Sequence, residues 1–216
     1  MNETAERLMD LAESHIRNAG YGGFSFRDLA AEIGIKSASV HHHFPTKATM
    51  AAAVARRYAD RFLDTVAGQP NEAAEDAIAM YRSAFRAALE RDGRMCLCGV
   101  LGAEAGGLPR EVAEAILTFF NRCIEDLSRR IGGPDPKARA LHVMATLEGG
   151  MMLARAFGSI EAFDQATANL VEPLAIPKHG TRSRQRLRSQ SCAYEIEEER
   201  TRPIIGSLRP SCGGFA

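Results

Sequence analysis

The sequence predicts an all-α fold, with a small N-terminal three-helix domain followed by a larger C-terminal helical domain. Apolar residues recur at spacings of three and four through most of residues 1–176, which is the periodicity of amphipathic helices. Alanine and leucine recur throughout, whereas runs of β-branched residues are nearly absent. With 216 residues, the chain is long enough to hold one small and one larger helical domain.

Composition weighs against several classes of protein. The 27 basic and 27 acidic side chains balance, unlike those of a general nucleic-acid coat protein. No apolar stretch reaches the ~20 residues that span a bilayer, and no secretory signal opens the chain. We therefore expect a cytoplasmic protein with no membrane partner. The five cysteines are then expected to be free thiols.

The N-terminal region contains clear signals for the start and the end of short helices. Ser25 is suited to cap a helix, with Asp28 three residues later as its capping-box partner. Gly34 is suited to the left-handed position that ends this helix. A second helix is expected over about residues 38–44, until Pro45 stops it. Two short helices joined by such a turn form a helix-turn-helix, whose second helix enters the major groove of DNA.

The exposed side of this second helix is expected to contact DNA. Small residues at its start, where Ser37 is the expected cap, let the helix approach base edges closely, while serine and histidine hydrogen-bond to bases or phosphates. A lysine at the start of the next helix is suited to bind a phosphate. Histidines 41–43 point about 100° apart on a helix, so we predict no metal site there. The predicted DNA contacts are Arg27, Lys36, Ser37, Ala38, Ser39, His41, His42 and Lys47.

The order and spacing of residues in this region resemble a known family. The residues that carry the similarity are Gly20-Tyr21, Ser25, Asp28-Leu29-Ala30, Gly34-Ile35, Val40, His43-Phe44 and Lys47. Over about residues 1–60, the chain resembles the N-terminal DNA-binding domain of the TetR family of bacterial transcriptional regulators. It departs from the family pattern at His41 and His42, where aromatic residues are usual, and at Ala48, where an acidic residue is common.

The resemblance implies a function and a set of partners. It implies a transcriptional regulator, most often a repressor, that binds a palindromic double-stranded DNA operator as a homodimer. An unidentified small-molecule effector is expected to bind the C-terminal domain and to shift the spacing of the two DNA-binding domains. No cofactor and no enzymatic activity are expected. A structural or interaction protein that keeps the helix-turn-helix without binding DNA is an alternative.

Breaks in the apolar periodicity divide the chain into three parts. Residues 1–46 are predicted to be the DNA-binding domain, and residues 47–176 the effector-binding and dimerisation domain, with a connecting helix over 47–67. Residues 177–216 hold eight bases and four acids without apolar periodicity, and they are expected to be a disordered tail. Further helices are expected over about 72–93, 95–105, 110–131, 136–157 and 160–175.

A ligand pocket is expected where the short apolar segment 95–104 meets the neighbouring helices. Pockets in helical proteins form between helices and are mostly apolar with a few polar groups. Glu104 is an acid that is costly to bury unless it is paired. The alternative, that each of these residues is simply part of the core, stays open. The predicted lining is Phe85, Met95, Cys96, Cys98, Leu101, Glu104, Phe119 and Phe120.

Cys96 and Cys98 indicate an alternative function, a thiol-based sensor of oxidants or electrophiles with the same fold. A reactive thiol needs a pKa depressed by nearby positive charge, and Arg91 and Arg94 are close in sequence. The spacing of two residues points the thiols to different faces of a helix, which disfavours a mutual disulfide or a shared metal. Burial as small apolar residues is the competing interpretation. A thiol enzyme is not expected, because the neighbouring sequence supplies no base.

One broad side of the helix over residues 136–157 is expected to form the dimer interface. Gly149-Gly150 permits close approach of another helix there. This helix and the next one, taken from two subunits, would form the four-helix bundle that the family implies. The alternative is an ordinary core face within one subunit. The predicted interface residues are Leu141, Met144, Ala145, Glu148, Met151, Met152 and Arg155.

Overall fold

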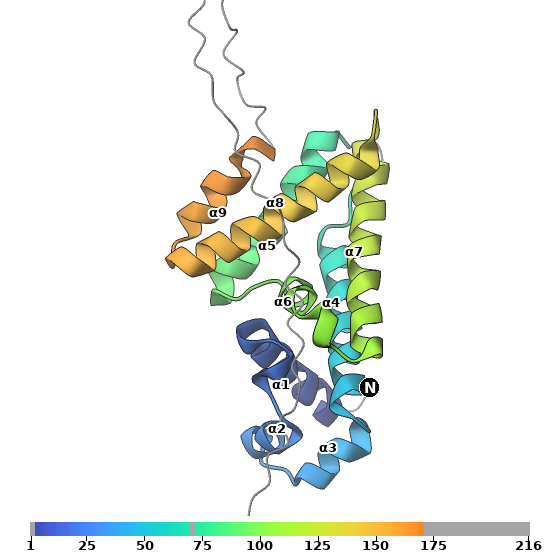
Figure 1. The fold of residues 1–216 in the computed structure, drawn as a ribbon, viewed down its shortest axis with the longest axis vertical. Helices are drawn as coiled ribbons and strands as arrows, with labels where there is room; N and C mark the ends of the chain where they lie inside the picture. The colour runs from blue at the N-terminus through green and yellow to red at the C-terminus, as the bar shows by residue number, and fades with distance from the viewer. Residues whose placement is uncertain (1–2, 70–71, 171–216) are drawn as a thin grey trace, which may run out of the picture. The chain divides into compact units, whose positions relative to one another are not determined.

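The computed structural model describes residues 3–69 and 72–170, which form α-helices, short 3-10 segments and connecting loops. These ranges contain no β-strand, which confirms the predicted all-α class. The predicted tail over residues 177–216 lies outside the described residues. The helices are α1 (Glu3–Ala19), α2 (Phe26–Ile33), α3 (Ser37–His43), α4 (Lys47–Thr65), α5 (Ala74–Asp92), α6 (Leu97–Ala103), α7 (Arg110–Ile131), α8 (Pro136–Phe157) and α9 (Ile160–Thr167) (Figure 1).

The turn between α2 and α3 is held by hydrogen bonds between residues close in sequence. The Ser25 hydroxyl accepts the backbone N–H of Asp28 at 3.2 Å and donates to its carboxylate at 2.6 Å, which caps α2 as predicted. At the other end, Gly34 has a φ of +74° and the N–H of Ile35 donates to the Ala30 carbonyl at 2.9 Å. A left-handed glycine with this bonding pattern ends a helix, so the chain turns sharply into α3.

The next helix begins one residue earlier than predicted. Lys36 occupies the cap position of α3 in an extended conformation, and no side chain caps the helix. Ser37 is therefore the first residue of α3, and its prediction as the cap is wrong. Pro45 follows α3, and the Thr46 hydroxyl then caps α4 by accepting the N–H of Thr49 at 2.9 Å.

The first three helices pack around a common apolar centre, which the start of α4 adjoins. Burying such side chains is the main force that stabilises a small helical unit. Because α3 contributes only its inner side to this centre, its opposite side remains on the surface. The buried side chains include Leu8, Ile16, Phe24, Leu29, Val40 and Phe44.

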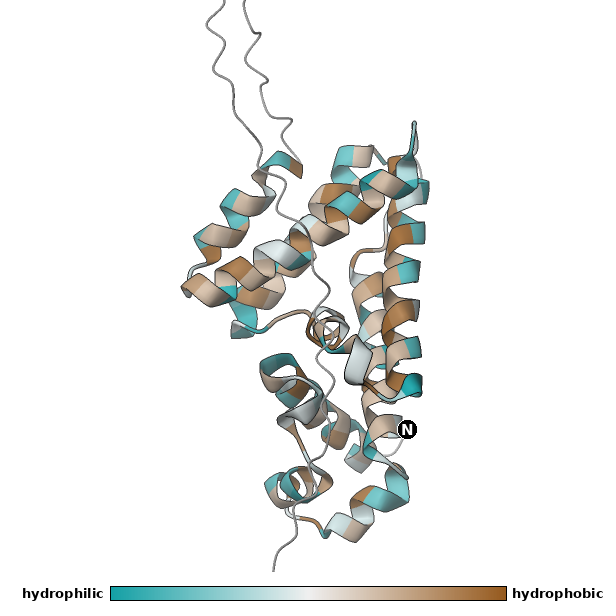
Figure 2. Ribbon diagram, in the orientation of Figure 1, coloured by the Kyte–Doolittle hydropathy of each residue, from teal (hydrophilic) through white to brown (hydrophobic). Residues whose placement is uncertain are grey.

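The remaining helices form a larger core around α4 and α7. These two helices lie side by side (Figure 1), and α8 packs on both α7 and α9. The ring of Phe62 on α4 makes edge-to-face contacts with Tyr81, Phe85 and Phe119, with ring centroids 5.4–5.6 Å apart. Apolar and polar residues alternate within the turns of α7 (Figure 2), as expected for a helix with one buried side.

Helix α6 is shorter than predicted, because a side chain from α1 holds the residues before it. The Nε of Arg17 donates to the Met95 carbonyl at 2.8 Å, and its Nη2 donates to the Arg94 carbonyl at 3.3 Å. α6 begins only at Leu97. At the other end of the core, α9 ends at Thr167 and a 3-10 turn over Ala168–Leu170 follows, so the predicted α-helix is interrupted there. The last part of the predicted helix, residues 171–175, lies outside the described residues.

The described residues belong to one compact unit that spans Met1–Ala175. The predicted domain boundary between residues 46 and 47 falls inside this unit. Helix α1 contacts both α4 and α6, so the three-helix unit (α1–α3) is packed directly against the larger core.

Candidate functional site

The outward side of α3 carries most of the residues that the sequence predicts to contact DNA. Val40 is fully buried on the inward side, and this contact fixes which side of α3 faces solvent. Arg27, on α2, is exposed as well. The exposed residues on and just before α3 are Lys36, Ser37, Ala38, Ser39, His41 and His42.

Two histidines of α3 have ring neighbours within the three-helix unit. The ring of His41 meets Phe26 edge-on with centroids 4.8 Å apart, and its Nδ1 lies 3.4 Å from the Pro45 carbonyl oxygen. The ring of His42 contacts His43, with centroids 5.5 Å apart. His41 is thus positioned by α2. Within residues 3–69 and 72–170, no group of three His, Cys, Asp or Glu side chains is arranged to hold a metal ion.

Lys47 is engaged by the protein and is not directed into solvent. Its Nζ donates to the Phe24 carbonyl at 2.6 Å and lies 4.7 Å from the ring centroid of Tyr21 and 4.6 Å from that of Phe24. Partial burial lowers the pKa of Lys47, and the nearby Glu104 carboxylate opposes this shift. The ammonium therefore stabilises the start of α4 against the turn before α2. Binding a DNA phosphate requires it to leave these contacts.

Glu104 lies outside the pocket that the sequence predicts for it. It is exposed at the end of α6, and its carboxylate accepts the backbone N–H of Tyr21 at 2.9 Å. Gly20, with a φ of +73°, lies so close that a Cβ atom on it would overlap this carboxylate. The prediction that Glu104 lines the pocket is therefore wrong, because a backbone donor and solvent satisfy its charge. Glu104 instead joins α6 to the three-helix unit.

The other residues predicted to line the pocket pack against one another. Phe120 is half-buried, and its ring meets that of Phe119 with centroids 5.2 Å apart. In this structure these side chains form part of the core, which is the alternative that the sequence leaves open. The fully buried members are Phe85, Met95, Cys96, Cys98, Leu101 and Phe119.

The three thiols of the described residues lack the property that a sensor requires. Burial raises the pKa of Cys96 and Cys98 well above that of an ordinary thiol, and the Glu148 carboxylate raises both further. Burial also raises the pKa of Cys123, to about 12. Oxidants and electrophiles react with the thiolate, so this structure does not favour the thiol-sensor alternative.

Glu148 is a buried carboxyl group that faces α6 within one subunit. Neither of its oxygens has a hydrogen-bond partner of suitable geometry among the described residues. Burial raises the pKa of Glu148 to about 7, and the neighbouring Cys96 thiol opposes this shift. Gly99 of α6 provides the space, because a Cβ atom there would overlap the carboxylate. The assignment of Glu148 to the dimer interface is corrected accordingly.

The other residues predicted for the dimer interface divide between two sides of α8. Met144 and Met151 are buried in the subunit's own core, so their assignment to the interface is corrected. Leu141, Ala145 and Met152 are exposed. Apolar residues occupy both sides of this helix, so helical spacing alone does not separate the core side from the exposed side.

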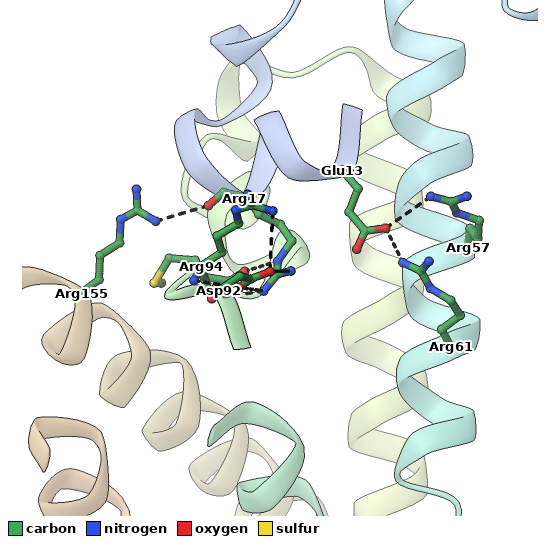
Figure 3. A network of polar contacts seen from close by, with 8 residues as sticks. Glu13, Arg17, Arg57, Arg61, Asp92, Arg94 and Arg155 are labelled. Carbon is green, nitrogen blue, oxygen red and sulfur yellow. Dashed lines mark hydrogen bonds and ion pairs between the residues drawn. The ribbon is translucent and has the colours of Figure 1, made fainter. Parts of the chain in front are cut away.

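Arg155 is exposed and turned toward the end of α1. It donates to the carbonyl of Asn18 at 2.8 Å. It also lies 3.5 Å from the carbonyl oxygen of Arg17, a contact drawn in Figure 3. Unpaired carbonyls at a helix end are favoured partners for arginine. The exposed apolar surface of α8, here called the α8 stripe, instead consists of Leu141, Ala145, Met152, Leu153 and Phe157.

Arg17 anchors α1 to the loop between α5 and α6. Besides the two loop carbonyls, its guanidinium binds the Asp92 carboxylate at 2.9 and 3.2 Å, and the side chain is almost fully buried (Figure 3). Arg17 is not among the predicted site residues, because an arginine at the end of an amphipathic helix has the same local pattern as a solvated one. Its partner lies 75 residues away, and no local signal identifies it.

Comparisons with known proteins agree with this geometry. Residues 8–54 match the family described as bacterial regulatory proteins, tetR family. A TetR transcriptional regulator from Legionella pneumophila is 27% identical, with a TM-score of 0.73 over 79% of this chain and 96% of that chain. A TetR-family regulator from Agrobacterium tumefaciens is 24% identical, with a TM-score of 0.74 over 78% of this chain and 96% of that chain. No curated protein sequence matches the chain.

A third solved structure has the same fold. The reduced form of E. coli NemR is 22% identical, with a TM-score of 0.67 over 78% of this chain and 95% of that chain. In the described part of this chain, no helix has the length and apolar character needed to cross a membrane. The matched segment contains the capped helix-turn-helix with its exposed α3 surface, and the structural likeness extends through the larger core. The chain therefore has the fold of TetR-family transcriptional regulators, and its residues 8–54, which hold the helix-turn-helix, match the DNA-binding segment of that family.

Proposed function

We propose that this protein is a cytoplasmic repressor that binds a palindromic operator as a homodimer and leaves it when a small-molecule effector binds. It acts by binding and not by catalysis. The observation that carries the proposal is the exposed side of α3, on a helix whose orientation is fixed by the buried Val40. Lys36, Ser39 and His42 place hydrogen-bonding groups on this side, and direct base recognition needs such groups on a helix that fits the major groove.

The α8 stripe supports the homodimer. Its side chains are among the most exposed large apolar groups of the described chain, with Met152 61% and Phe157 71% exposed. Four of the five exposed large apolar side chains of the described residues lie on α8, and exposed apolar surface concentrated in this way marks an interaction site. Pairing of two such stripes about a two-fold axis would bury them and present two copies of α3 to successive major grooves, ~34–36 Å apart.

Polar contacts between α1 and the larger core support control by an effector. Arg17 and Arg155 bind across this boundary on one side, and Glu104 binds the Tyr21 backbone on another. A change in the larger core therefore acts on the position of the three-helix unit. Linkage is reciprocal, so operator DNA should weaken effector binding by the factor by which the effector weakens DNA binding.

A titration of fluorescently labelled DNA tests the assignment of α3. The DNA flanking the protein's own coding sequence is titrated with protein at two salt concentrations, with excess non-specific competitor. Lys36→Gln should weaken binding by roughly tenfold, and Ser39→Ala should change sequence preference. The matched controls are Lys137→Gln and Ser83→Ala, which alter exposed residues of α8 and α5. If both α3 variants bound DNA with the affinity and the sequence preference of the wild type, the proposal would be contradicted.

A further inference from the structure

A cavity of about 500 Å³ lies between α1, α4 and α5. This volume is within the usual range for small-molecule sites. The eight pocket residues that the sequence predicts do not line it. The cavity instead touches the three-helix unit through α1 and the larger core through α5, with α4 joining the two. A ligand bound here would contact both parts of the protein.

One wall of the cavity is apolar. Tyr58 and Phe62 of α4 have ring planes only 13° apart, with centroids 6.5 Å apart. Helix α5 contributes Ala84, Ala87 and Ala88, whose methyl groups leave space that larger side chains would fill. A wall of rings and methyl groups suits an aromatic or acyl group.

The rest of the lining is charged, and its acids are already paired. Glu13 pairs with Arg61 and with Arg57, and Arg57 also binds Asp10 at 2.8 Å. The Glu13 contacts are drawn in Figure 3. The third acid of the lining, Asp92, is held by Arg17. A bound cation would have to displace an arginine from one of these carboxylates.

The bases of the lining are not all paired. The Arg91 side chain lines the cavity from the last turn of α5 and makes no hydrogen bond or ion pair with another described residue. Arg94 reaches Asp92 only at 3.6 Å. The Ser14 hydroxyl also lines the cavity and has no hydrogen-bond partner in the described part of the chain. Among the described residues of the lining, the Arg91 guanidinium and the Ser14 hydroxyl therefore lack a partner, and both can donate a hydrogen bond.

We propose that this cavity binds an amphipathic organic anion, with its apolar part against Tyr58 and Phe62 and its charge at Arg91. The ligand class is a carboxylate or sulfonate on an aromatic or acyl group, because hydrogen bonds from arginine to an anion are stronger than those between neutral groups. This inference rests on the proposed function, since it names the class of effector. The ligand bridges α1 and α5, so its binding is linked to the affinity of the three-helix unit for DNA.

Two fluorescent probes that differ by one sulfonate test the site. 1-Anilinonaphthalene-8-sulfonate is an amphipathic anion, and N-phenyl-1-naphthylamine is its uncharged counterpart. Both are titrated into the full-length protein without DNA. Arg91→Gln should lower the affinity for the sulfonate probe by roughly three- to tenfold, as expected for the loss of one partly exposed charged contact. The affinity for the uncharged probe should not change. Arg91→Lys should retain most of the affinity.

Two further variants separate this cavity from other apolar surfaces. Ala88→Phe fills the space beside the α4 rings and should lower the affinity for both probes. Arg110→Gln changes an exposed arginine of α7 and should leave both affinities unchanged. If Arg91→Gln leaves the affinity for the sulfonate probe unchanged, or lowers both affinities equally, the proposed anion site is overturned. Unchanged affinities in a folded Ala88→Phe variant would also overturn it, because the probes would then bind elsewhere.

Operator binding supplies the link to regulation. Saturating sulfonate probe should change the half-saturation concentration of operator DNA at least roughly threefold for the wild type, and should have no effect on Ala88→Phe. An unchanged operator affinity would overturn the assignment of the effector class. If the protein binds no specific DNA, the proposed function fails, while the probe titrations still decide whether the anion site exists.

Discussion

Replacing Arg17 by methionine is expected to destabilise the protein by about 3 kcal/mol. The Arg17 side chain is 3% exposed and makes two hydrogen bonds to the Asp92 carboxylate and two to backbone carbonyls. Methionine preserves apolar volume but removes every donor. Removing one partner of a buried ion pair costs about 3–5 kcal/mol, because the other partner stays buried. Asp92 is partly exposed, which places the expected loss at the lower end.

The measurement is urea unfolding followed by circular dichroism, at one protein concentration because a dimer's stability depends on it. The matched control is Arg110→Met, whose arginine is 92% exposed and pairs with Glu114 one turn away. An exposed pair of this kind contributes at most about 0.5 kcal/mol. The double variant Arg17→Met/Asp92→Asn should recover part of the loss. A loss below about 1 kcal/mol for Arg17→Met would refute the reasoning.

Three further predictions concern a glycine, a buried acid and the α8 stripe. Gly20→Ala should lower the free energy of unfolding by at least about 1 kcal/mol, because Gly20 has a positive φ and lies against the Glu104 carboxylate. Gly22→Ala should have little effect in the same urea assay, because the space around Gly22 is open. For Glu148, the folded-state pKa of about 7 lies above the ordinary 4.5, so the folded state holds this proton more tightly. Its stabilising contribution is complete below pH 4.5 and is lost as the pH rises to about 7. The free energy of unfolding of Glu148→Gln should therefore rise relative to that of the wild type by about 3 kcal/mol across this window. A difference in unfolding free energy that stays constant with pH would contradict this. Met152→Glu should convert the dimer to a monomer in sedimentation experiments, whereas Leu117→Glu, at a residue of α7 that is also about 60% exposed, should leave the dimer intact; equal effects of the two changes would argue against the α8 stripe.

Local signals in the sequence predicted the helix-turn-helix well. The cap formed by Ser25 and Asp28 and the left-handed Gly34 involve residues at most a few positions apart. Their geometry follows from backbone chemistry that the sequence displays directly. The exposed side of α3 follows as well, because a short helix with one buried valine has only one way to face its neighbours.

Long-range contacts account for the partners that local sequence patterns do not reveal. Lys47 binds the Phe24 carbonyl, and Glu104 binds the backbone of a residue 83 positions earlier. Helical spacing does not specify such partners, which depend on how helices cross. The two sides of α8 show the same limit, since Met144 is buried and Met152 exposed although both are apolar. Periodicity detects an apolar helix side but not what covers it.

The central claim is that the exposed side of α3 recognises a specific DNA sequence. The most direct test is selection of genomic DNA fragments by the purified full-length protein, followed by footprinting of the bound fragments. We expect a protected pseudo-palindrome whose half-sites are centred about 10–10.5 base pairs apart, or a multiple of this spacing. We also expect that a folded Ser39→Ala/His42→Ala variant loses this selection. Recovery of fragments without a shared sequence, or an unchanged footprint with the variant, would contradict the claim.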